Sequence, residues 1–178
     1  MLWVMFSYEN TLAPLDTKKV RLFRPIQIFF EAFRNKKVAF LALGFLFMQI
    51  GYSLYFQYIV VHMRFAFQYG SEQLGWFSSM IGVGYFIGLV LLVPIADKFL
   101  KTKSIAIISC LVMALLQMVS SMIVLAEPQW YLAVFIAAFD IVMFTVMWTL
   151  FANSVEKDRQ GWVMGVANAM MGIAWMLT

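Results

Sequence analysis

Long apolar runs dominate the hydrophobic pattern of this 178-residue chain, and polar residues are mainly confined to the short segments between them. A helix rises about 1.5 Å per residue, so about 20 apolar residues cross a hydrocarbon core of about 30 Å. Four runs reach that length, and a fifth is still apolar at the last residue. The five predicted membrane spans are Val38–Val61, Leu74–Ala96, Ile105–Leu125, Tyr131–Ala152 and Trp162–Thr178.

These runs are expected to be helices, because they are too long and too uniform for strands and lack the alternation of a membrane barrel. Composition points the same way. The chain is 63% hydrophobic and 12% charged, with a mean hydropathy of +0.85, whereas soluble domains are about half apolar and about a quarter charged. The pattern therefore predicts an all-α polytopic membrane protein.

The segments before the first span have a different character from the spans. Residues 1–13 form an apolar stub that is too short to cross a membrane and lacks the leader and cleavage site of a signal peptide. We interpret it as the end of a preceding transmembrane helix. Residues 14–37 are predicted to be a cytoplasmic loop with an interfacial amphipathic helix, and residues 38–178 a transmembrane domain. The chain is therefore expected to be open at both ends, as a fragment would be.

Basic residues are distributed unevenly across the predicted spans. Twelve of the 13 Lys and Arg residues lie in segments on one side, and only Arg64 lies on the other. Because loops rich in Lys and Arg stay in the cytoplasm, the N-terminus is predicted to be cytoplasmic and the first span to run outward. A bacterial inner membrane is the expected location.

The chain lacks the residues that several kinds of catalytic or binding site require. Cys110 and His62 are each alone in the chain, so no disulfide and no metal set with His or Cys spacing can be assembled within it. The sequence has no Gly-rich phosphate loop and no plausible Ser-His-Asp combination. Basic residues do not interleave with aromatic ones, which argues against nucleic-acid binding. We expect no enzyme activity, no metal and no cofactor.

Asp140 is the exception to the absence of charge inside the spans, and it lies near the middle of the fourth. An Asp at the centre of a membrane helix costs about 2.5–3.5 kcal/mol on insertion scales, so such residues usually face an interior or a wet cavity. Ala133 and Ala137 share its face and leave room for water, substrate or another helix. A carboxylate whose surroundings change can take up and release protons. The alternative is that Asp140 only bonds a neighbouring helix.

Uncharged polar residues recur at helical spacing in other spans. In the first span they occupy one face, where cavity lining and helix packing are both open interpretations. The candidate cavity-lining residues are Gln49, Tyr52, Ser53, Gln57, Gln117 and Asn168. Small residues at such spacing usually mark close helix contacts. The glycines predicted to pack against other helices are Gly82, Gly161, Gly165 and Gly172.

Four segments resemble parts of the major facilitator superfamily. "FSYENTLAP" is similar to the Phe-x-x-Glu-Thr-Leu that closes the sixth helix, with Asn10 as an extra residue, and "RPIQIFFEAFRNKKVAFLAL" resembles the central loop leading into helix seven. "VPIADKFLKTKS" resembles the loop motif Gly-x-Leu-Ala-Asp-Arg-x-Gly-Arg-Lys, with Asp97, Lys98 and Lys101 at acidic and basic positions. "SVEKDRQGWVMGVANAMMGIAW" resembles the Gln-Gly-x-x-x-Gly segment after helix ten.

This resemblance implies the C-terminal six-helix half of a major facilitator fold, truncated in its fifth span and closest to tetracycline and multidrug:proton antiporters. It implies secondary active transport by alternating access, with proton-coupled efflux of small hydrophobic or drug-like molecules. Asp140 would then be the proton or ion coupling site, and Asp97, Lys98 and Lys101 would belong to a cytoplasmic gate. The implied partners are membrane lipid, a small-molecule substrate and a missing N-terminal six-helix half.

Other functions remain open at this point. A proton symporter for a small metabolite or osmolyte would use the same buried acid. A truncated, transport-inactive fragment that acts only by pairing with another membrane protein is an alternative of another class. A membrane enzyme is the weakest alternative, because no nucleophile and base pair is present.

Overall fold

The computed structural model describes residues 33–178, and this part of the chain is helical with no strand. The predicted stub at residues 1–13 and most of the predicted loop at residues 14–37 lie outside the described residues. The elements in chain order are α3 (Lys36–Ala66), α4 (Ser71–Ile87), a π-helical segment (Gly88–Leu92), α5 (Val93–Phe99), α6 (Thr102–Met122), α7 (Ala126–Ala152), a short 3-10 turn (Lys157–Arg159) and α8 (Gln160–Leu177).

Four continuous helical stretches are long and apolar enough to cross a membrane, which confirms the predicted fold class. They are Lys36–Ala66, Ser71–Phe99, Thr102–Met122 and Ala126–Ala152. The second combines α4, the π-helical segment and α5. α8 is also helical, but it is not among the four, so a fifth membrane span stays a prediction.

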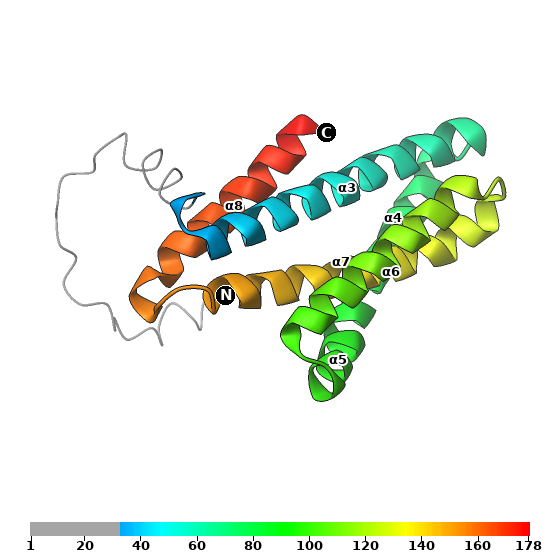
Figure 1. The fold of residues 1–178 in the computed structure, drawn as a ribbon. Helices are drawn as coiled ribbons and strands as arrows, with labels where there is room; N and C mark the ends of the chain where they lie inside the picture. The colour runs from blue at the N-terminus through cyan, green and yellow to red at the C-terminus, as the bar shows by residue number, and fades with distance from the viewer. Residues whose placement is uncertain (1–32) are drawn as a thin grey trace, which may run out of the picture.

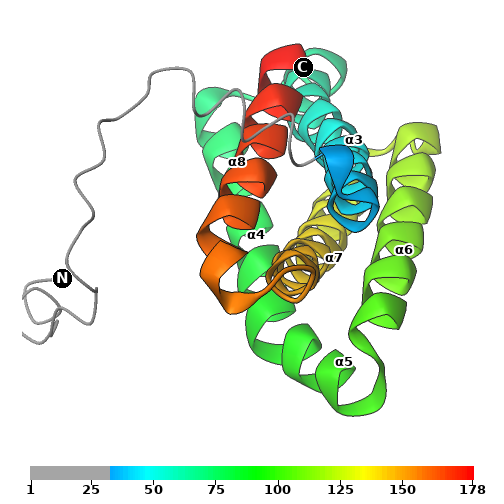
Figure 2. The ribbon, with the colours of Figure 1, turned by 60° about the vertical axis from the view of Figure 1, so that its left-hand side comes forward.

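The helices are arranged around α7 (Figures 1 and 2). α7 contacts α6 along one side, α4 and the π-helical segment along another, and α3 and α8 through fewer residues. α8 packs mainly against α3. The turn from α3 to α4 and the turn from α6 to α7 lie together at the right-hand end in Figure 1, and the α7–α8 connection lies at the opposite end. The central position of α7 explains why its buried residues outnumber those of its neighbours.

Polar side chains fix several helix ends. The Asn35 side-chain oxygen accepts a hydrogen bond from the Lys37 amide at 3.1 Å and so caps the start of α3. At the start of α4, the Gln73 side chain accepts from the Gly70 amide at 2.9 Å. These two side chains cap the starts of α3 and α4, and they explain why both helices begin before the predicted apolar runs.

Gln129 explains why α6 ends at Met122, three residues before the predicted limit. This buried glutamine on α7 accepts from the Ser120 hydroxyl at 2.6 Å, and its amide donates to the backbone carbonyls of Ser120 and Ile123 at 2.8 and 3.2 Å. Carbonyls at a helix C-terminus need such partners, above all within a membrane. Gln129 therefore satisfies the end of α6 and holds the tight turn into α7.

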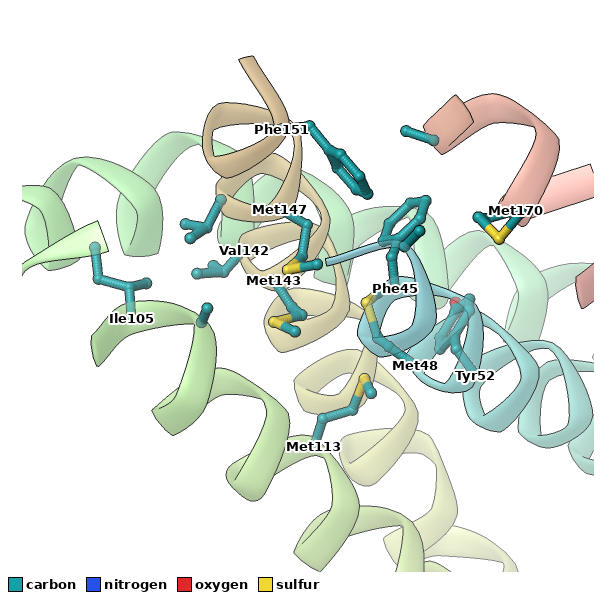
Figure 3. Packing of buried hydrophobic residues seen from close by; sticks show 14 of the residues in the cluster. Phe45, Met48, Tyr52, Ile105, Met113, Val142, Met143, Met147, Phe151 and Met170 are labelled. Atoms are coloured by element: carbon teal, nitrogen blue, oxygen red, sulfur yellow. The ribbon is translucent and has the colours of Figure 1, made fainter. Parts of the chain in front are cut away.

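Phenylalanine and methionine fill the core between α3, α6, α7 and α8 (Figure 3). Phe45 of α3 packs edge-on against Phe151 of α7, with 5.8 Å between the ring centroids. Methionines from several helices fill the remaining space, as their flexible side chains allow. The labelled residues of this cluster in Figure 3 are Phe45, Met48, Tyr52, Ile105, Met113, Val142, Met143, Met147, Phe151 and Met170.

The second span departs from the uniform helix that its apolar run predicts. Between Gly88 and Leu92 the backbone is π-helical, and the Val93 amide bonds to the Gly88 carbonyl five residues back. Pro94 follows directly and has no amide hydrogen to give to the preceding turn. π-helical segments are typically single turns within longer α-helices. Hydropathy cannot reveal a π-helical turn, because a π turn and an α turn can be formed by residues of the same polarity.

Close helix contact falls at two glycines that were not predicted to pack. A Cβ added to Gly84 would lie 2.9 Å from the Ala137 Cβ and would also meet the Val134 carbonyl group. A Cβ added to Gly88 would lie 2.9 Å from the Ala138 Cα. Only glycine allows α4 and the π-helical segment to approach α7 so closely.

The four glycines that were predicted to pack do not lie at close contacts between the described helices. A Cβ added to any of Gly82, Gly161, Gly165 or Gly172 meets no atom within 4 Å. Packing of these four glycines against other helices therefore stays a prediction. Within the described residues, the orientation of α4 turns Gly84 toward α7 and leaves Gly82 exposed.

Candidate functional site

Three polar side chains from three helices meet near the middle of the bundle. Tyr52 of α3 and Tyr85 of α4 share a hydrogen bond between their hydroxyl groups. Both tyrosines lie within electrostatic range of Asp140 on α7. The structure thus brings the predicted coupling residue Asp140 together with the predicted cavity residue Tyr52. It adds Tyr85, which the sequence analysis did not single out.

The close approach of α4 to α7 places Tyr85 beside Asp140. Gly84 and Gly88 lie on either side of Tyr85 in the chain, and both contact the stretch of α7 from Val134 to Ile141. Asp140 belongs to that same stretch. The two glycines are four residues apart, so they share one helix face and fix the distance between the helices. Tyr85 lies about 100° around the helix from Gly84, and its hydroxyl meets that of Tyr52 on α3.

Asp140 is buried although it carries a carboxylate. Only 5% of the residue is exposed, and its Oδ1 atom has no hydrogen-bond partner among the described residues. A buried acid is costly unless it is neutral, paired or in contact with water. Within the described residues, no group of three or more His, Cys, Asp or Glu side chains is arranged to hold a metal ion. The arrangement of one acid beside two hydroxyls suits proton uptake and release.

The other predicted cavity residues fall into two groups. Gln49 and Ser53 are buried on the same helix as Tyr52, and the Ser53 hydroxyl donates to the Ile50 carbonyl of its own helix at 3.1 Å. Gln117 is partly buried, and its Nε2 atom has no partner among the described residues.

Gln57 and Asn168 are exposed in the described part of the chain. The Gln57 side chain donates to the Thr178 hydroxyl at 3.1 Å, which joins α3 to the end of α8. Cavity lining by these two residues stays a prediction, because both are exposed in the described part of the chain. Gln49, Tyr52 and Ser53 form the buried polar face of α3, as the helical spacing predicts.

The predicted gate residues lie at the far end of the second span. Asp97 and Lys98 are exposed on the last turn of α5, and Lys101 is exposed at the start of α6. They lie on α5 and just before α6, whereas Asp140 lies on α7. A gate role for them stays a prediction.

A family model described as Major Facilitator Superfamily matches residues 1–178 of the chain. The chain belongs to the major facilitator superfamily. No curated protein and no solved structure matches it. The superfamily consists of membrane transporters, which agrees with four helices able to cross a membrane. The protein is therefore an integral membrane protein of a transporter family.

Within this superfamily chain, sequence reasoning missed Tyr85 and Gln129. Tyr85 is one of several aromatic residues in an apolar run, and Gln129 lies between the third and fourth predicted spans, so neither was singled out. One signal was available for Tyr85, because Gly84 and Gly88 form a small-xxx-small pair around it. For Gln129 the only signal was its place just after a short turn, where the preceding helix ends.

Proposed function

We propose that this member of the major facilitator superfamily is part of a proton-coupled transporter that works by alternating access and exports small hydrophobic or drug-like molecules. The observation that carries the proposal is the burial of Asp140 at the junction of α3, α4 and α7, with the Tyr52–Tyr85 pair beside it. Acids at membrane depth are expensive and usually functional.

Coupling of proton movement to transport would follow from the two protonation states of Asp140 and from the hydrogen bonds that the two tyrosine hydroxyls can donate. A protonated Asp140 is neutral and suits a closed, dry site. An ionised Asp140 needs water or hydrogen-bond donors, and the tyrosine hydroxyls are donors. Opening the site to water on one side would therefore favour release of the proton to that side. A difference in proton concentration across the membrane can then drive the conformational change.

The preference for hydrophobic substrates rests on the side chains near the acid. Phe45 and Met48 of α3 belong to the same buried cluster as Tyr52, and Met143 and Met147 bring α7, the helix of Asp140, into that cluster (Figure 3). Flexible thioethers and aromatic rings adapt to ligands of different shapes. We also propose that transport needs a second six-helix half, because substrate sites of such folds lie between two repeats.

The experiment is proton-driven movement of a lipophilic dye cation, ethidium, in liposomes that contain the 178-residue chain, with and without a co-expressed N-terminal half of the family. We expect pH-driven ethidium movement with the pair, and its loss in Asp140→Asn. The matched control is Glu127→Gln, which removes an exposed acid from the same helix. Circular dichroism checks that both variants keep their helices.

Each outcome has a defined meaning. Unchanged pH-driven flux in Asp140→Asn would assign Asp140 to packing and overturn the coupling role. Absence of ethidium flux in every combination, together with uptake of a small polar metabolite when the gradient is reversed, would favour the symporter alternative. Absence of any flux with either half would overturn the transporter proposal for this chain.

A further inference from the structure

A small apolar groove lies between the π-helical segment, α5, α6 and α7. Its volume is about 240 Å³, and all but one of its lining residues are apolar. Ile95 and Phe99 form one wall, Ile108 forms another, and Phe139 and Val142 form the floor. Ile95, Phe99 and Ile108 are themselves exposed, so the groove opens to the surface of the membrane domain.

The size and lining of the groove restrict what can occupy it. At about 30 Å³ for each water-sized group, the groove has room for about eight such groups in a row. Water would find almost no hydrogen-bond partners on these walls, whereas hydrocarbon would bury apolar surface. A transmembrane helix is about 10 Å across and is too thick for this space. A stretch of lipid acyl chain fits both the volume and the chemistry.

Positive charge surrounds the mouth of the groove. The Lys98 ammonium lies over the ring of Phe99, a groove-lining residue, at 5.7 Å from the ring centroid. Lys101 immediately precedes α6, and Lys103 lies in its first turn. In the described part of the chain no side chain caps the amides at this helix start. Asp97 is the acid nearest in sequence to these three lysines, so the segment between α5 and α6 keeps an excess of positive charge.

We propose that this groove binds an acyl chain of an anionic phospholipid, whose headgroup phosphate is held by Lys98, Lys101 and Lys103 at the start of α6. A phosphate at a helix N-terminus is favoured by the exposed amides and the helix dipole. Basic residues next to a membrane surface attract anionic headgroups. Asp140 is not among the residues that line the groove, and the proposal does not depend on the proposed transport function.

The test measures which lipids stay bound to the 178-residue chain. The chain is extracted from vesicles made of equal parts of phosphatidylglycerol and phosphatidylcholine, and the retained lipids are identified by native mass spectrometry. One variant removes the charges with Lys98→Gln, Lys101→Gln and Lys103→Gln. The matched control removes three exposed charges elsewhere with Arg34→Gln, Lys36→Gln and Lys37→Gln. A third variant, Ala96→Phe, fills the groove.

We expect the first variant to lower the ratio of retained phosphatidylglycerol to phosphatidylcholine by at least about tenfold, and the control to change it less than about twofold. Ala96→Phe should reduce retention of both lipids, because it blocks the acyl chain. An equal loss in both charge variants would mean general surface attraction and would overturn the site. Unchanged retention in Ala96→Phe, with circular dichroism showing intact helices, would also overturn it. Loss of a dimer in that variant would assign the groove to a second copy of the chain instead.

Discussion

The hydroxyl groups of Tyr52 and Tyr85 share a hydrogen bond that joins α3 to α4 beside the carboxylate of Asp140 on α7. This contact joins two helices, and both of its tyrosines lie within electrostatic range of a buried acid. Packing and proton coupling were opposed interpretations of Asp140 in the sequence, but the geometry allows one arrangement to do both.

The Tyr52–Tyr85 bond should contribute measurably to stability. Hydrogen bonds between membrane helices average about 0.6 kcal/mol and reach about 1.7 kcal/mol. We expect a double-mutant cycle of Tyr52→Phe and Tyr85→Phe to give a coupling energy within that range. The measurement is unfolding in detergent followed by circular dichroism. Tyr58→Phe is the control, because Tyr58 is exposed on α3. Strictly additive effects of the two substitutions would show that the bond adds nothing to stability.

Gly84→Ala should destabilise the bundle, because the added methyl group meets the backbone of α7, which cannot move aside cheaply. Overpacking of this kind costs about 1–3 kcal/mol. Gly82→Ala should be neutral or slightly stabilising, because the site is open and alanine favours helix by up to about 1 kcal/mol. The same unfolding measurement compares the two. A larger loss in Gly82→Ala than in Gly84→Ala would contradict the helix orientation described above.

Gln129→Leu should lower the free energy of unfolding by about 1–3 kcal/mol, because two backbone carbonyls and the Ser120 hydroxyl lose their partner in a buried place. Gln57→Leu, which removes an exposed glutamine with one bond, should cost less. Hydrogen exchange at the end of α6 provides a second readout. Faster exchange there in Gln129→Leu alone is expected, and equal exchange in both variants would argue against this role.

The orientation in the membrane can be tested with single cysteines in a Cys110→Ser background. Glu72→Cys lies beyond the α3–α4 turn, whereas Lys101→Cys and Lys157→Cys lie in basic segments. Because basic loops stay in the cytoplasm, an impermeant maleimide should label only Glu72→Cys from outside the cell. The two lysine positions should react only after the membrane is permeabilised. The reverse pattern would invert the predicted topology.

The sequence predicted those features that depend on residue type alone. Hydropathy located four spans within a few residues of their ends, and the polar spacing of Gln49, Tyr52 and Ser53 identified the buried face of α3. The isolated charge of Asp140 identified the buried acid. These predictions succeeded because the membrane penalises polar groups strongly enough for local sequence to reveal their burial.

Features that depend on which face one helix turns toward another could not be predicted from the sequence. Gly82 and Gly84 differ by two positions, which in a helix is about half a turn, and only the packed structure shows which of them contacts α7. Tyr85 could be assigned to the site only after that orientation was known. Asn168 and Gln57 have the same polarity as Gln49, but they face away from the described core.

The π-helical turn from Gly88 to Leu92 sets the phase between the two ends of the second span. A π turn accommodates one residue more than an α turn, and one residue corresponds to a rotation of about 100° in an α-helix. If the same residues wound as a regular α-helix instead, α5 would be rotated by about a quarter of a turn relative to α4. Ile95 and Phe99 would then leave the groove wall while Tyr85 stayed beside Asp140. The π winding of this segment is thus an independent determinant of what the far end of the span can bind.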